Sequence, residues 1–388
     1  MLMSVSPQVA SVEAPPIAEA MSWVWPGERN RVFLNLCQAV PSYPPAQELQ
    51  AEFARLAQTD GIGGYTNIYG LDGLRSVHAA SLSADYAGRI DAAQVAITTG
   101  CNQAFAAAIL EVAQAGESVV MPTPWYFNHQ MWLRMLGIGI QAIPAFAVGR
   151  NYPDVAEAER AITSTTRAIV LCTPNNPTGA IYPAEVIHAF FELAQRKGIA
   201  LILDETYKDF RPNAAPSHDL FQRPDWDQTL IQLYSFSKVY ALAGYRLGSL
   251  ISSDTLLREA AKILDCMTIC PPHITQAGVI YALSHLAEWK RGKLDVMAGR
   301  LAAIRAAFEA EDLQFEMVSS GAYFAYVKHP FRGELSKPVA MRLAQEHDVL
   351  CLPGVMFGPG QEDYLRFAFA NVEGALMQPL VDRLRGAQ

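Results

Sequence analysis

Short apolar runs alternate with longer amphipathic segments between about residues 95 and 252. The runs are rich in β-branched residues and predict strands at Gln94–Thr98, Ser118–Met121, Ile138–Ile143, Ala168–Cys172, Ile199–Leu203, Leu230–Tyr234 and Leu247–Ser252. The segments between them predict helices at Asn102–Ala115, at Pro183–Lys197 with the proline in the first helical position, and at Thr255–Met267. This alternation is typical of an α/β fold whose mostly parallel central sheet is sandwiched by helices.

The pattern changes after residue 280. A long helical stretch leads to Glu311, short strands are expected around Ala322–Val327 and Tyr364–Ala370, and the last helix is expected at Glu373–Leu384. We interpret this region as a smaller α+β domain, completed by residues before about 45. The expected division is an N-terminal arm with part of the small domain over 1–45, a large domain over 46–280 and a small C-terminal domain over 281–388. The Pro- and Ala-rich Met1–Ala20 indicates an extended or partly disordered arm.

Composition excludes several classes of function. The formal charge of the 388 residues is −8, so a nucleic-acid footprint is not expected. No apolar run approaches the ~18 residues of a membrane span, and the N-terminus does not resemble a signal peptide. The six cysteines and eight histidines are scattered without metal-ligand spacing, which favours reduced thiols in a cytoplasmic protein without a metal.

Polar residues that suit one cofactor follow the predicted strands. Ser235, Lys238 and Arg246 come after the strand at 230–234. A lysine there can condense with an aldehyde, and the hydroxyl and guanidinium can hold a phosphate dianion, which are the needs of pyridoxal phosphate. Asp204 ends another strand, where it either pairs with a protonated pyridine nitrogen or caps the next segment.

Four segments resemble motifs of the class I and II aminotransferases, which are fold-type I pyridoxal-phosphate enzymes. Their aspartate, aromatic and kynurenine aminotransferases are the expected relatives. Ser235–Arg246 resembles the lysine motif of this family, and Thr173–Gly179 its Asn-Pro-x-Gly motif. Tyr364–Ala370 resembles the strand whose arginine holds the substrate carboxylate, and Gly64–Gly70 resembles a segment that reaches the partner subunit. The motifs stand in family order over residues 65 to 370.

The resemblance implies a role for each matching position, with Lys238 as the catalytic residue. The implied cofactor contacts are a turn at Gly100, Cys101 and Asn102, a ring at Tyr126 with Trp125 as its rival, Asn176 and Tyr207 at the 3-oxygen, Asp204 at the ring nitrogen, Ser235 and Arg246 at the phosphate, and Tyr65 at the partner's phosphate. The implied substrate contacts are Arg366, Asn176 and Ala39.

We therefore expect a homodimeric aminotransferase with a shared active site, which moves an amino group between an amino acid and a 2-oxo acid through a Schiff base on Lys238. A carbon–sulfur β-lyase or another elimination or decarboxylation enzyme on the same fold remains an alternative. A pyridoxal-phosphate-sensing regulator is disfavoured, because the short arm before Ala39 leaves no room for a helix-turn-helix.

Departures from the family pattern bear on the substrate. Ala39 stands where the family usually has glycine, and Asp265 stands where aspartate aminotransferases have an arginine for the distal carboxylate. Together with four aromatic residues, these departures favour a non-acidic substrate side chain, either aromatic or of another neutral kind. The aromatic residues in question are Trp23, Trp25, Tyr43 and Trp125.

Overall fold

The structure, a computed structural model, describes residues 4–24, 31–146, 150–212 and 216–388. Seven strands form one large sheet in the spatial order β2-β8-β7-β6-β5-β3-β4. Only β8 runs antiparallel to its neighbours in this sheet. The mostly parallel sheet expected from the sequence is therefore confirmed. The strands are β2 Val95–Thr98, β3 Ser118–Thr123, β4 Gly139–Pro144, β5 Thr166–Cys172, β6 Ala200–Asp204, β7 Leu230–Ser235 and β8 Gly248–Ile251.

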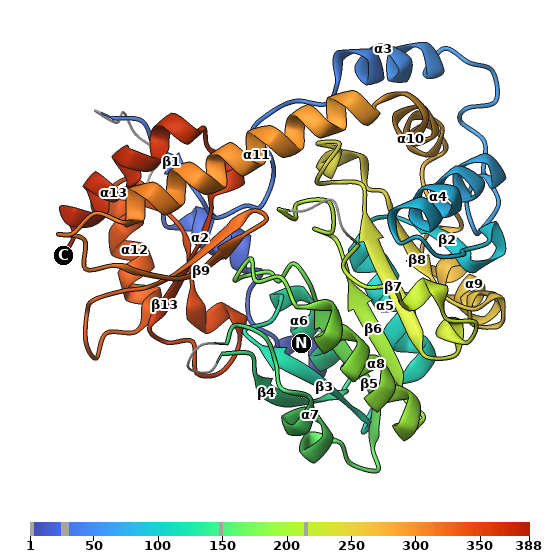
Figure 1. The fold of residues 1–388 in the computed structure, drawn as a ribbon, viewed down its shortest axis with the longest axis horizontal. Helices are drawn as coiled ribbons and strands as arrows, with labels where there is room; N and C mark the ends of the chain where they lie inside the picture. The colour runs from blue at the N-terminus through green and yellow to red at the C-terminus, as the bar shows by residue number, and fades with distance from the viewer. Residues whose placement is uncertain (1–3, 25–30, 147–149, 213–215) are drawn as a thin grey trace.

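Helices cover both faces of the large sheet, because its central strands are apolar on both sides. In β5, Ile169 and Leu171 pack into one core cluster and Val170 packs into the other. Helix α8 (Ala184–Lys197) contributes to the first cluster and α5 (Cys101–Val112) to the second, so the two helices lie on opposite faces (Figure 1). The other helices here are α3 Gln47–Leu56, α4 Asp72–Asp85, α6 Phe127–Met135, α7 Val155–Ala161, α9 Asp254–Thr268 and α10 His273–His285.

A second assembly is built on a four-stranded antiparallel sheet, the small sheet, in the order β12-β13-β10-β9. Helix α11 crosses from the side of α10 to this assembly (Figure 1). Strand β1 (Leu34–Asn35) pairs in parallel with β11 (Val349–Leu350), so a segment near the N-terminus joins the C-terminal part of the chain. The remaining elements are β9 Glu316–Gly321, β10 Phe324–Lys328, β12 Leu352–Pro353, β13 Tyr364–Ala368, α11 Ala287–Phe308, α12 Ser336–Glu346 and α13 Met377–Arg385.

Three local expectations are wrong. The arm is not extended throughout, since the short helices α1 (Pro7–Ala10) and α2 (Pro16–Ser22) each begin at a proline, whose fixed φ suits a first turn. Pro183 is the cap residue before α8 rather than its first helical residue. Ala322 has a left-handed φ of 46° and belongs to the turn before β10 rather than to the strand. Across the described ranges, no helix is long and apolar enough to cross a membrane.

Candidate active site

A cavity of about 390 Å³, the inner pocket, lies where β5, β6 and β7 end. The carboxyl edge of a parallel sheet is the usual ligand site in α/β folds. The structure brings together at this pocket most of the residues that the sequence singled out. Those that line it are Ala39, Cys101, Asn102, Tyr126, Asn176, Asp204, Tyr207, Ser235, Lys238, Arg246 and Arg366.

The amine of Lys238 lies inside the inner pocket. Its Nζ donates a hydrogen bond to the main-chain oxygen of Ala39 at 2.8 Å and lies 5.5 Å from the centroid of the Tyr207 ring. Burial, followed by the positive charges of Arg366 and Arg246, lowers the pKa of Lys238 to about 8. The free amine, which is the nucleophilic and basic form, is therefore accessible near neutral pH.

Asp204 is buried and held by a residue that sequence reasoning missed, His129 of α6. The imidazole Nε2 lies 3.2 Å from Asp204 Oδ2, and the His129 ring stacks on Phe105 with centroids 4.0 Å apart. The Thr206 N–H donates to Asp204 Oδ1 at 2.9 Å. Burial alone would raise the pKa of Asp204, but the hydrogen bond and charge of His129 and the bonds from Thr206 outweigh it, so this pKa is lowered overall. Asp204 therefore stays an anion.

Arg366 reaches the inner pocket from β13 in the small sheet. Its guanidinium lies between the rings of Phe324 and Phe357, at 5.1 and 5.2 Å from their centroids. Nη1 donates to Asn176 Oδ1 at 3.1 Å and Nη2 donates to the main-chain oxygen of Cys37, while the buried Nε has no partner among the described residues. Burial lowers the pKa of Arg366 to about 10. The free donor suits a carboxylate ligand.

An anion cradle lies at the N-terminus of α5. Gly100 caps this helix with φ of 81°, and an added Cβ there would lie 2.5 Å from Nη2 of Arg246. Ser235 is buried at the end of β7 and lines the same pocket as Arg246. The first N–H groups of a helix have no intrahelical partner and favour anions. Hydroxyl, guanidinium and helix terminus thus face one small space.

Other expected residues lie away from the inner pocket. Tyr65 is 78% exposed on the surface. Of the two rival rings, Trp125 lines a separate cavity and Tyr126 lines the inner pocket. Trp23 is buried elsewhere, Tyr43 packs on the Trp289 ring and Asp265 is exposed on α9. Trp23, Tyr43 and Trp125 do not line the inner pocket, and Trp25 lies outside the described residues.

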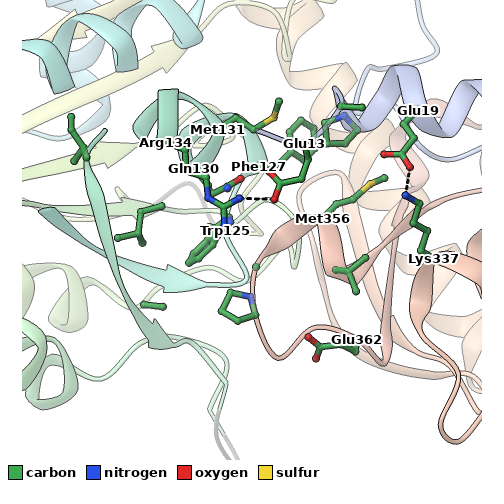
Figure 2. A pocket seen from close by; sticks show the side chains of 18 of the residues that line it. Glu13, Glu19, Trp125, Phe127, Gln130, Met131, Arg134, Lys337, Met356 and Glu362 are labelled. Atoms are coloured by element: carbon green, nitrogen blue, oxygen red, sulfur yellow. Dashed lines mark hydrogen bonds and ion pairs between the residues drawn. The ribbon is translucent and has the colours of Figure 1, made fainter. Parts of the chain in front are cut away.

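The N-terminal arm closes one side of the inner pocket, which the sequence pattern did not indicate. Pro15, Pro16 and Ile17 line it. Pro16 also lines a larger outer pocket of about 940 Å³ between the arm, α6 and the loop before β13. Figure 2 shows two ion pairs across this outer pocket, one from the arm to each sheet assembly. They are Glu13 Oε1 with Arg134 Nη1 at 2.5 Å, and Glu19 with Lys337 of α12.

Comparisons with known proteins agree with this geometry. The model of the family "Aminotransferase class I and II" matches residues 31–384. The aromatic aminotransferase ISS1 of Arabidopsis thaliana is 28% identical over 91% of this chain and 89% of that protein. An aspartate aminotransferase of Sulfolobus acidocaldarius is 26% identical over 90% and 89%. A single mutant of Thermus thermophilus aspartate aminotransferase shares the fold, with a TM-score of 0.88, 21% identity and full coverage of both chains.

The chain therefore belongs to the class I and II aminotransferase family, and it is a pyridoxal-phosphate-dependent aminotransferase. The family match and the names of these relatives favour amino transfer over the lyase alternative. The inner pocket fits the cofactor on its own features: an amine of lowered pKa, a buried carboxylate held as an anion, and the glycine cradle beside Arg246.

Proposed function

We propose that this aminotransferase works on amino acids with neutral side chains, using pyridoxal phosphate held at Lys238. The observation that carries the cofactor part of this proposal is the convergence of Lys238, Asp204 and Arg366 on one pocket of about 390 Å³. Lys238 lies in the turn after β7, Asp204 ends β6, and Arg366 lies on β13 of the other sheet. An amine, an anion and a free guanidinium donor in one small space match the needs of the cofactor and of an amino acid.

Each group of residues has a proposed place on the cofactor. Lys238 would hold the aldehyde through Nζ, and Asp204 would hold the ring nitrogen in its protonated form. Tyr126 would pack on the ring, and Asn176 and Tyr207 would serve the 3-oxygen. The phosphate would lie in the anion cradle, which consists of Gly100, Cys101, Asn102, Ser235 and Arg246. When bound, the cofactor supplies an electron sink for the pair left at the substrate Cα.

The chain supplies the proton movement. Lys238 Nζ would take the proton from the substrate Cα as a base and would give it as an acid to the cofactor carbon that carried the aldehyde, for which a pKa of about 8 is well matched to neutral pH. Arg366 holds the substrate carboxylate through its free Nε and so presents the Cα–H bond to Nζ. Asn176, already bonded to Arg366, fixes the orientation of the guanidinium. The arm residues around Pro16 exclude water from this side.

The wall left for the substrate side chain is neutral. Apart from Asp204, Lys238, Arg246 and Arg366, no charged side chain of the described residues lines the inner pocket. The remaining wall is mainly apolar or amide, and Ala39 adds a methyl group at its edge. An acidic side chain would lose its hydration there without gaining a cation from the described residues of this chain beyond Lys238, Arg246 and Arg366. The wall residues are Pro15, Pro16, Ile17, Val40, Phe127 and Asn128.

A donor panel tests the substrate proposal. The enzyme is loaded with pyridoxal phosphate and given phenylalanine, methionine, leucine or aspartate with pyruvate or 2-oxoglutarate as acceptor. We expect kcat/KM for the neutral donors to exceed that for aspartate by about 100-fold or more, the cost of an unpaired buried charge. A preference for aspartate would contradict the neutral pocket.

A lysine variant tests the site itself. Lys238→Ala should lose both transfer activity and the visible absorption that bound pyridoxal phosphate gives the wild-type protein. Lys262→Ala is the control, because this exposed lysine pairs with Glu259 on the surface of α9 and does not line the inner pocket. A coloured and active Lys238→Ala protein would show that another residue holds the cofactor.

We also propose a cytoplasmic homodimer with a shared active site. Tyr65 is exposed in one chain, and an apolar groove beside α5 is lined by Phe105, Trp132 and Met267, which suits a second copy. The six cysteines are free, which suits a reducing compartment. Mixing Lys238→Ala with Tyr65→Ala chains should restore activity, because one site of the mixed dimer keeps both wild-type residues. No gain on mixing would contradict a shared site.

The same arrangement supports the proposed domain division of 1–45, 46–280 and 281–388. The pairing of β1 with β11 connects the first part to the last, and the large sheet lies wholly within the middle part. The inner pocket then lies between the two domains, with Lys238 on the large domain and Arg366 on the small one.

A further inference from the structure

A hairpin of the small sheet touches the main chain of Lys238. Tyr323, in the turn between β9 and β10, is fully buried and donates its hydroxyl to the main-chain oxygen of Lys238 at 3.0 Å. Among the main-chain N–H groups of the described residues, only that of Ala241 also donates to this oxygen, at 3.3 Å and inside the same turn. The segment that carries the lysine is thus bonded to a second sheet assembly through one tyrosine hydroxyl.

The lysine segment needs outside support. Ala241 and Arg246 both have φ of 56°, in the left-handed region that residues with a Cβ disfavour. Such conformations persist where the surrounding structure holds them. Ala241 belongs to the turn whose carbonyl Tyr323 binds. The Tyr323 hydroxyl therefore binds a turn whose observed backbone conformation is intrinsically unfavourable for the residues that form it.

The tip of the hairpin is itself fixed against the large domain. Gly179 and Gly321 approach so closely that an added Cβ on either would overlap the main chain of the other. The Tyr323 ring packs on Tyr207, with centroids 5.4 Å apart at 62°, and on Phe210, with centroids 4.6 Å apart. These contacts restrict the Tyr323 side chain and so hold its hydroxyl at the Lys238 carbonyl.

We propose that Tyr323 is a positioning residue for amino transfer. Its hydroxyl fixes the main chain of Lys238 from the small-domain side and so determines where Nζ lies relative to Arg366, which comes from the same small sheet. Lys238 Nζ can accept and donate the proton only if it reaches the substrate Cα. Small misplacements of a reacting group reduce rates strongly. The effect on turnover rests on the proposed role of Lys238, whereas the effect on the turn rests on the hydrogen bond alone.

The matched pair of variants is Tyr323→Phe and Tyr326→Phe. Both tyrosines are fully buried in the same hairpin, and each variant loses one hydroxyl, which in Tyr326 donates to Gln361 Oε1 at 2.9 Å. Only Tyr323 bonds to the lysine segment. A loss of general stability would therefore affect both variants, and a positioning effect would affect one.

Two measurements decide the proposal. In the chain without pyridoxal phosphate, amide hydrogen exchange over 236–243 should be roughly fivefold faster in Tyr323→Phe, the effect of one lost hydrogen bond, and unchanged in Tyr326→Phe. In the loaded enzyme, Tyr323→Phe should lower kcat by about tenfold and leave KM within about twofold, because the Arg366 contact to the carboxylate is intact.

Equal exchange and equal kcat in the two variants would overturn the positioning role. Failure of the proposed function would give a different result. An active Lys238→Ala protein would show that Lys238 is not the catalytic residue, whereas the difference in amide exchange over 236–243 between the two tyrosine variants would remain. An inactive Lys238→Ala protein, together with equal exchange in the two tyrosine variants, would support the catalytic role of Lys238 and contradict the positioning role of Tyr323.

Discussion

The lowered pKa of Lys238 predicts a pH-dependent stability that a single substitution removes. The pKa falls from 10.5 to about 8 in the folded chain. Between these values the unfolded chain binds more protons than the folded chain, so the free energy of unfolding rises with pH across this window. The full difference corresponds to about 3 kcal/mol. Lys238 is partly exposed through the pocket, and solvent screens part of this energy. We therefore expect the free energy of unfolding to change by about 1–3 kcal/mol across the window.

Urea unfolding of the chain without cofactor measures this change. Wild type and Lys238→Met are compared at several pH values from 7 to 10, and all other titrating groups cancel in the difference. Wild type should gain stability relative to the variant as the pH rises. Lys290→Met is the control, because the Asp209 carboxylate outweighs burial and raises the pKa of Lys290, so its contribution changes only above this range. A difference between wild type and Lys238→Met that stays constant with pH would refute the reasoning.

Three further substitutions test other parts of the site. Asp204→Asn removes the proposed partner of the cofactor ring, and kcat should fall by about 100-fold or more in steady-state assays, as for a broken buried ion pair. Arg366→Lys should raise KM for the amino donor by about tenfold or more through the loss of forked bonds to the carboxylate, with a smaller effect on kcat. Gly100→Ala, with φ of 81° and a Cβ 2.5 Å from Arg246 Nη2, should weaken cofactor retention about tenfold in a dialysis assay. Unchanged retention would show that the cradle tolerates the methyl group.

The large sheet and most of the pocket residues could be predicted from the sequence, for a common physical reason. Strands buried on both faces are continuously apolar, so β5 and β6 are visible as runs. Parallel strands end at one edge, so polar residues that follow them, such as Asp204 and Lys238, meet there. The family motifs added Arg366, which comes from the other sheet and which strand order alone does not bring to this edge.

The contacts that could not be predicted are those that no sequence motif or residue spacing marks. His129 lies inside α6 with no special spacing, and only the packing of that helix brings it to Asp204. Pro16 reaches the pocket at the start of helix α2, whereas the composition of the arm indicated an extended or partly disordered chain. Tyr323 binds a main-chain carbonyl, and every residue has one of these. Long-range contacts of this kind follow from tertiary structure.

The charge of the inner pocket is opposite to that of the whole chain, and this contrast explains its titration. The chain carries a formal −8, yet the pocket gathers Lys238, Arg246 and Arg366 around the single carboxylate of Asp204. Burial and neighbouring cations lower the pKa of Lys238, and burial lowers that of Arg366, so each positive charge destabilises the folded chain locally. A phosphate dianion and a substrate carboxylate would relieve this destabilisation, because each brings negative charge to these cations. The same close cations that lower the pKa of the Lys238 amine thus favour the anionic ligands on which it is proposed to act.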